Sequence, residues 1–168
     1  MIQPDKNNKG NFIMYDKGNP VGEAALDYID GVPVVASVKP IIVDMQRAAA
    51  RDGVMITLAA GFRPWSKQLE MRKRHVIDKS KANDIAHLVN APAGEFKPLT
   101  ARPGWSNHQD GMAYDFNVTG RPKVYRWLVD NAIKFGFVRT VPSERWHWEY
   151  RPKAKQFDFV KQTDPSWQ

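Results

Sequence analysis

The sequence predicts an α+β fold in which a small, mainly antiparallel sheet is flanked by helices. Two observations predict it: apolar residues recur at helical spacing in two segments, and two other segments alternate between aromatic and polar residues as strands do. With 168 residues, the chain is long enough for one compact domain with a hydrophobic core and too short for two of ordinary size. We therefore expect one domain, 1–168, with one functional site.

Helices are expected in three segments. The first begins at Pro40 and ends where Gly53 can form the C-terminal cap, and its apolar residues at helical spacing are Ile41, Ile42, Met45, Ala48 and Ala49. The second begins near Ser66, after a short β-prone run at 54–60. The third begins with Pro122 in its first turn and stops at Gly136, and its apolar residues are Val124, Trp127, Leu128, Ala132 and Phe135.

The remaining segments are expected to be less regular. Residues 1–37 carry several Gly, Pro, Asn and Asp residues, which predicts an irregular N-terminal segment with a hairpin around Asp30 and Gly31. Residues 78–104 form a long connection with a short helix around 85–89, and connections of this length often form lids or rims. Residues 151–168 are expected to form a C-terminal tail.

Composition excludes several classes of protein. The chain is 42% hydrophobic and 26% charged, which is typical of a soluble globular protein, and no apolar run is long enough for membrane insertion. Cysteine is absent, so a metal would have to be held by His, Asp or Glu. Residues 1–10 lack the features of a secretory signal, so we expect a mature chain or export by another route.

The chain is strongly basic. Its net charge is +7 and its pI is near 9.7, which favours attraction to polyanions such as nucleic acid, anionic lipid or the acidic polymers of a bacterial wall. We do not expect nucleic-acid binding, because the basic residues lack interleaved stacking aromatics and no recognised binding motif is present.

Two short segments carry residues suited to metal chemistry. Alternation at 113–118 separates Asp115 from the neighbouring aromatics, and alternation at 145–150 separates His147 and Glu149 from theirs. If both segments lie side by side in one sheet, the aromatics enter the core and Asp115 and His147 are presented together. His108, from the turn through Gly111, could add a third ligand and leave the open position of a catalytic zinc site.

Two carboxylates, two histidines and four aromatic residues also have expected roles. Glu144 lies three residues before His147 and could reach a metal-bound water. Glu149 is either a hydrogen-bond partner of that imidazole or part of a surface ion pair. His75 and His87 fit no ligand spacing, and we expect both to be exposed. For Tyr114, Phe116, Trp146 and Trp148 we expect core positions rather than substrate contacts.

Three motifs carry a resemblance to a known family. Ser-x-His-x-x-Gly-x-Ala-x-Asp at 106–115, Glu-x-Trp-His at 144–147 and Gly-Phe-Arg at 61–63 resemble the zinc D-Ala-D-Ala carboxypeptidases of the VanY type. That family includes phage L-alanyl-D-glutamate endolysins and shares the hedgehog/DD-peptidase fold. The resemblance covers residues 32–150. It implies one zinc ion on the open sheet face, with the ligands His108, Asp115 and His147.

The resemblance also implies roles for four other residues. Glu144 would be the general base, Arg63 would stabilise the charge on the scissile carbonyl, and substrate contacts would come from Arg63, Gln68 and Ser106. The implied substrates are peptidoglycan stem peptides, so we expect action on the bacterial cell wall, in the periplasm or outside the cell.

Three functions stay open at this point. The main expectation is a D-alanyl-D-alanine carboxypeptidase or dipeptidase. An L-alanyl-D-glutamate endopeptidase is the second, and small size and cationic charge favour such a lytic or delivered enzyme. The third is a zinc-bearing binding module without catalysis, against which the presence of Glu144 and Arg63 argues.

Overall fold

The computed structural model describes residues 1–155, so the predicted tail beyond residue 155 lies outside the described residues. The described chain forms two compact units, each built from two stretches of sequence. Within the described residues, the hairpin unit contains residues 1–26 and 63–111, and the sheet unit contains residues 27–62 and 112–155. That residues 1–168 act as one domain stays a prediction.

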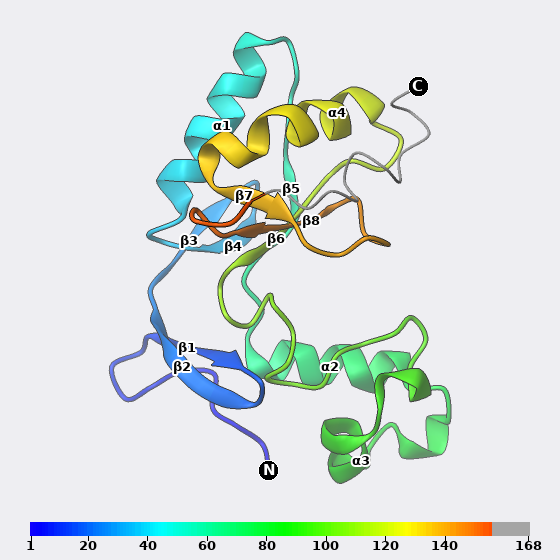
Figure 1. Cartoon of the computed structure of the whole chain (residues 1–168). Coiled ribbons are helices and arrows are strands. Elements are labelled where there is room, and N and C mark those ends of the chain that lie inside the picture. Colours follow the sequence, from blue (N-terminus) through cyan, green and yellow to red (C-terminus); the bar gives the residue numbers. More distant parts are fainter. Residues whose placement is uncertain (156–168) are drawn as a thin grey trace. The chain divides into compact units, whose positions relative to one another are not determined.

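The sheet unit is built on a four-stranded antiparallel sheet with the order β5-β6-β8-β7 (Figure 1). Its strands are β5 (Leu58–Ala60), β6 (Ala113–Phe116), β7 (Phe137–Arg139) and β8 (His147–Tyr150). A separate pair, β3 (Leu26–Ile29) and β4 (Val32–Val35), is joined at Asp30 and Gly31. Both turn residues have positive φ, so the predicted hairpin at this position is confirmed.

Helices α1 (Lys39–Arg51) and α4 (Pro122–Asn131) cover one face of this sheet (Figure 1). Each has its proline in the first turn, where the missing N–H costs no hydrogen bond. A 3-10 turn (Ala132–Phe135) follows α4 and ends at Gly136, whose φ of 79° suits glycine. The predicted α+β architecture is therefore confirmed.

The core of the sheet unit lies between the helices and the sheet. Tyr114, Phe116 and Trp148 are fully buried in it, and Phe137 packs edge-on against Tyr114 and Phe116 at ring distances of 5.9 and 6.1 Å. Trp146 is an exception: it lies just before β8 begins and is 40% exposed, so the expectation that it belongs to the core is wrong.

The hairpin unit combines β1 (Phe12–Asp16) and β2 (Asn19–Ala24) with α2 (Trp65–His75) and α3 (Ile85–Asn90). Short 3-10 turns at Lys79–Lys81 and Ala93–Glu95 flank α3, and a small core forms from Val76, Leu88, Ala91 and Phe96. Segment 1–37 is less irregular than expected, because β1 and β2 form a second hairpin through Lys17 and Gly18, both with positive φ.

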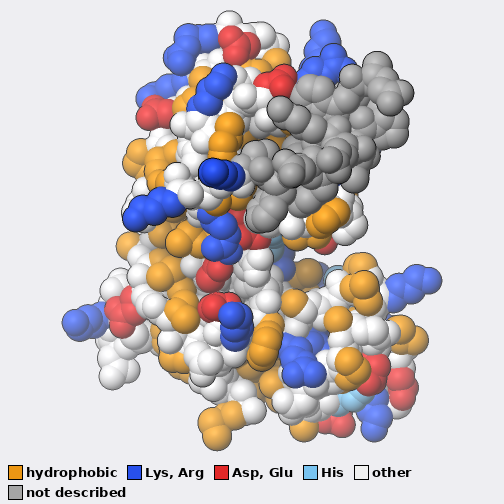
Figure 2. Space-filling view, viewed as in Figure 1, with side chains coloured by type: hydrophobic (Ala, Val, Ile, Leu, Met, Phe, Trp, Pro, Cys, Tyr) orange, Lys and Arg blue, Asp and Glu red, His pale blue; other side chains and the backbone are white. Residues whose placement is uncertain are grey.

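The charged side chains do not gather into one patch on the face shown in Figure 2, where Lys and Arg are interspersed with Asp and Glu. Among residues 1–155, no helix combines the length and the apolar character needed to cross a bilayer.

Candidate metal centre

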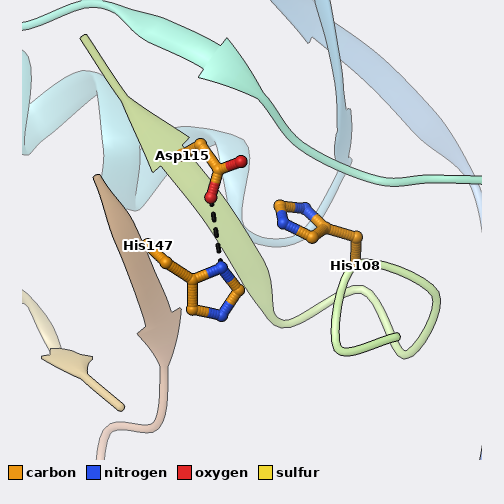
Figure 3. Close-up of side chains that lie close together, drawn as sticks. All are labelled: His108, Asp115 and His147. Carbon is orange, nitrogen blue, oxygen red and sulfur yellow. Dashed lines mark hydrogen bonds and ion pairs between the residues drawn. The ribbon is translucent and has the colours of Figure 1, made fainter. Parts of the chain in front are cut away.

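Asp115 and His147 are direct partners across strands β6 and β8. Their neighbours Tyr114, Phe116 and Trp148 enter the core, so alternation places Asp115 and His147 on the other face of the sheet. Nδ1 of His147 lies 3.1 Å from Oδ1 of Asp115 (Figure 3). The backbone register of the two strands thus sets this pair, as the sequence predicts.

His108 supplies the third side chain of the group. Ligand atoms of His108, Asp115 and His147 all lie within 4.8 Å of one another, and the three side chains point toward one another in Figure 3. Both imidazoles are 5% exposed. The His108 amide donates to Oγ of Ser106 (3.4 Å), and the carbonyl of His108 accepts from the amide of Arg63 (2.9 Å).

The donor set fits zinc. Two imidazoles and one carboxylate are ligands that Zn²⁺ prefers, and three protein ligands leave a position open, as in catalytic zinc sites. The chain has no cysteine, so this group of nitrogen and oxygen donors is consistent with the metal that the sequence motifs imply.

Both ring nitrogens of His147 contact carboxylate oxygens. Its Nε2 lies 3.3 Å from Oε1 of Glu149. Burial acts to lower the pKa of His147, whereas hydrogen bonds to Asp115 and Glu149 and the charges of these carboxylates raise it, and the resulting pKa is about 9. The raised pKa favours the protonated imidazole at neutral pH, so a metal ion would have to displace a proton to bind it.

Glu144 lies beside this group and remains accessible. Its Oε2 is 3.7 Å from Nδ1 of His147, and its side chain is 41% exposed. The turn before β8 positions it, since its amide donates to the carbonyl of Val141 (3.2 Å) and its carbonyl accepts from the amide of His147 (3.3 Å). A carboxylate next to the grouped ligands that water can still reach is suited to proton transfer.

Arg139 organises the turn that carries Glu144, and sequence analysis missed it. The side chain is 2% exposed. Its Nε donates to the carbonyl of Glu144 (3.3 Å), Nη2 to the carbonyl of Pro142 (2.5 Å) and Nη1 to the hydroxyl of Tyr125 (2.5 Å). The available signal is a cation directly after the apolar pair Phe137 and Val138, and these three residues form β7, a strand that the sequence does not predict.

Arg63 and Gln68 contact each other in the hairpin unit. Nη1 of the half-buried Arg63 donates to Oε1 of Gln68 (3.0 Å), and Nε2 of Gln68 donates to the carbonyl of Ala101 (2.8 Å). Gln68 is 1% exposed. Its amide therefore orients the guanidinium of Arg63, while a direct contact of Gln68 with substrate stays a prediction.

Ser106 and Gln109 stabilise the loop that carries His108. The carbonyl of Ser106 accepts from the Gln109 amide (2.8 Å). Gln109 is fully buried; its Oε1 accepts from the amide of Gly104 (2.7 Å) and its carbonyl accepts from the amide of Tyr15 (2.8 Å). Sequence analysis missed Gln109, because its partners lie on distant or irregular segments.

His75 and His87 are only partly exposed, so the expectation that both are exposed is wrong. Nδ1 of His75 lies 2.7 Å from Oγ1 of Thr100, and burial, followed by nearby positive charges, lowers the pKa of His75. Nε2 of His87 lies 3.2 Å from Oε2 of Glu95. Packing between α2, α3 and their connection explains the difference, and neither imidazole belongs to the metal-ligating group within residues 1–155.

Comparison with known sequences identifies the class of protein. Residues 34–153 match the VanY family, described as D-alanyl-D-alanine carboxypeptidase. The chain belongs to this family. The residues that match include the whole His108, Asp115 and His147 group.

Relatives agree with this assignment. A D-alanyl-D-alanine carboxypeptidase of Enterococcus faecalis (strain ATCC 700802 / V583) is 31% identical over 83% of this chain. A putative carboxypeptidase of Bacillus subtilis (strain 168), YodJ, is 26% identical over 62% of this chain. The chain spans 58% of the length of the first relative and 39% of the second.

Solved structures share the fold. One is VanYB in complex with D-alanine-D-alanine, which is 31% identical, with a TM-score of 0.61 and coverage of 82% of this chain and 84% of that chain. Another is a mutant of the vancomycin-resistance D,D-pentapeptidase VanY in complex with Zn(II), which is 30% identical, with a TM-score of 0.61 and coverage of 82% and 86%.

Proposed function

We propose that this chain is a zinc-dependent D-alanyl-D-alanine carboxypeptidase that trims peptidoglycan stem peptides. One observation carries the proposal: two imidazoles and a carboxylate offer ligand atoms within 4.8 Å of one another, on the family's own motifs. Membership of the VanY family and the Zn(II) and D-alanine-D-alanine complexes of its members support it.

His108, Asp115 and His147 are the proposed ligands of one zinc ion per chain. A bound zinc ion would lower the pKa of its water to roughly 7 and polarise the scissile carbonyl. The chain's own residues then have to move protons and orient the peptide.

Glu144 is the proposed general base. Its carboxylate lies 3.7 Å from His147 Nδ1 and can accept a proton from the attacking water. The same carboxyl group can return that proton to the amine of the leaving D-alanine. Because Arg139 and the turn at Val141 hold the backbone of Glu144, little ordering is needed before proton transfer.

Arg63 is the proposed electrophilic partner. The guanidinium, oriented by Gln68, offers N–H donors either to the scissile carbonyl oxygen as charge develops or to the terminal carboxylate of the peptide. We assign contacts with the peptide to Ser106 and Gln68 as well. The site of action is the bacterial cell wall, in the periplasm or outside the cell, where the net charge of +7 favours attraction to anionic wall polymers.

Mass spectrometry of purified cell-wall fragments after digestion tests this function. We expect loss of the terminal D-alanine from pentapeptide stems and no loss after metal removal. Cleavage between L-alanine and D-glutamate would instead assign the chain to the endolysin type. Intact fragments in the presence of a zinc-loaded protein would indicate a binding module.

A further inference from the structure

Glu149 is a buried carboxylate on the same sheet face as His147. It lies two residues further along β8 and is 1% exposed. Carboxylates are rarely buried this completely unless they are paired, because removing the charge from water is costly. The side chains that contact Glu149 therefore indicate the reason for its burial.

Three side chains hold the two oxygens of Glu149. Oε1 accepts from Thr140 Oγ1 at 2.6 Å and lies 3.3 Å from His147 Nε2. Oε2 accepts from Nε of Arg151 at 2.5 Å. Thr140 directly follows β7, whose Val138 pairs with Glu149, so backbone pairing fixes the carboxylate behind the imidazole.

The two ring nitrogens of His147 therefore face different groups. Nε2 faces Glu149, which is not among the grouped metal ligands, whereas Nδ1 faces Asp115 and Glu144 at 3.1 and 3.7 Å. A carboxylate that accepts from Nε2–H leaves Nδ1 as the nitrogen with a lone pair and fixes the plane of the ring.

We propose that Glu149 is a positioning residue that selects Nδ1 of His147 for the metal and holds the ring in its binding orientation. This inference rests on the proposed function, because it takes His147 as a zinc ligand. Thr140 and Arg151, which directly follow β7 and β8, also contact the Glu149 carboxylate.

A purely structural role for Glu149 makes a different prediction. If Glu149 were buried only to pair with Arg151, then Arg151→Gln, which removes the ion pair but leaves the contact with His147, would reproduce the effect of changing Glu149. Arg151 is 44% exposed, so this control variant leaves no buried cavity.

Zinc affinity, measured by competition with a chelator, and the Nε2–H proton signal of His147 in the zinc-loaded protein test the proposal. Glu149→Leu should weaken zinc binding by about 100-fold and lose the Nε2–H signal to solvent exchange. Glu149→Gln should weaken binding by about 10-fold and keep the signal, because its amide oxygen can still accept. Arg151→Gln should bind zinc within about 2-fold of the unchanged protein, because it leaves the Glu149 contact with His147 in place.

The outcomes separate the two proposals. Glu149 variants that bind zinc as tightly as the unchanged protein and keep the Nε2–H signal would overturn the role of Glu149 alone. An equal loss of affinity in Arg151→Gln would also overturn it. If Glu149→Leu does not fold, the result with the nearly isosteric Glu149→Gln decides. Failure of the unchanged protein to bind zinc would overturn the proposed function itself.

Discussion

Asp115 and His147 lie opposite each other in strands β6 and β8, with Oδ1 of the aspartate 3.1 Å from Nδ1 of the histidine. The aromatic residues beside them anchor the same strands in the core. Two members of the metal group are therefore positioned by strand pairing and core packing rather than by loops, which is the rigid support that a metal site needs.

Replacement of His147 or Asp115 by alanine should therefore abolish metal binding. We expect one zinc per chain in the unchanged protein and almost none in His147→Ala or Asp115→Ala, because only two of three ligands remain. Elemental analysis of the purified proteins gives the stoichiometry. His87→Ala, a partly buried imidazole beside Glu95, is the matched control and should keep its zinc. Full zinc content in His147→Ala would show that the ligand assignment is wrong.

Glu144→Gln should separate proton transfer from metal binding. The variant keeps the side-chain shape but cannot accept the proton, so turnover should fall by about 100- to 10,000-fold while zinc content stays unchanged. Release of D-alanine from a defined pentapeptide measures turnover. Glu70→Gln, on the exposed side of α2, is the control. Near-normal turnover in Glu144→Gln would require another base.

Arg139→Lys should disturb the turn that carries Glu144. Lysine cannot reach the carbonyls of Pro142 and Glu144 together with the Tyr125 hydroxyl, and each lost hydrogen bond to a charged group costs about 1.5–3 kcal/mol. We expect a lower free energy of unfolding in urea and a lower kcat, with zinc content unchanged. Unaltered stability and kcat would remove Arg139 from this role.

Arg63→Lys should impair catalysis while folding and zinc content stay intact. A planar fork that contacts two oxygens is replaced by one strongly hydrated point charge, and loss of one such donor costs up to about 1,000-fold. A fall in kcat with constant KM indicates a contact with the transition state, whereas a higher KM indicates a contact with the substrate carboxylate. Gln68→Leu, which removes the partner that orients Arg63, should change the same kinetic parameter, kcat or KM, in the same direction as Arg63→Lys but by a smaller factor. Unchanged steady-state values in Arg63→Lys would place Arg63 outside the site.

The metal-free protein should lose stability as the pH rises. The pKa of His147 is raised from its ordinary value of 6.5 to about 9, so the charged imidazole stabilises the fold fully below pH 6.5, and this contribution disappears as the pH rises through 9. Thermal unfolding with a chelator present, between pH 6 and 10, measures this dependence. His147→Gln should flatten it. If the unfolding temperature depended on pH equally in His147→Gln and in the unchanged protein, the loss of stability would have to come from other titratable groups.

Much of the fold could be predicted because it depends on local patterns. Helices α1 and α4 follow from apolar periodicity bounded by proline and glycine, and the pairing of Asp115 with His147 follows from aromatic alternation in β6 and β8. Hairpin β1–β2 was missed because Pro20 and Gly22 within β2 resemble loop residues. Strand β7 has three residues, too few to show a period.

The supporting residues of the site were harder to predict. Gln109 and Gln68 are buried because they bind backbone groups at Gly104 and Ala101, and no sequence spacing reports such partners. Arg139 likewise binds backbone carbonyls of the turn that connects β7 to β8, and no spacing in the sequence reports these partners. Glu149 could be placed on the face of His147 from alternation, but its burial and its contacts with Thr140 and Arg151 required the structure.

Reconstitution with zinc tests the central claim most directly. Metal-free protein is titrated with zinc, and release of D-alanine from a defined stem pentapeptide is measured at each step. The account predicts no release without metal and a rise that reaches a plateau at one zinc per chain. Release that does not depend on zinc, or zinc binding at this stoichiometry without any D-alanine release, would contradict it.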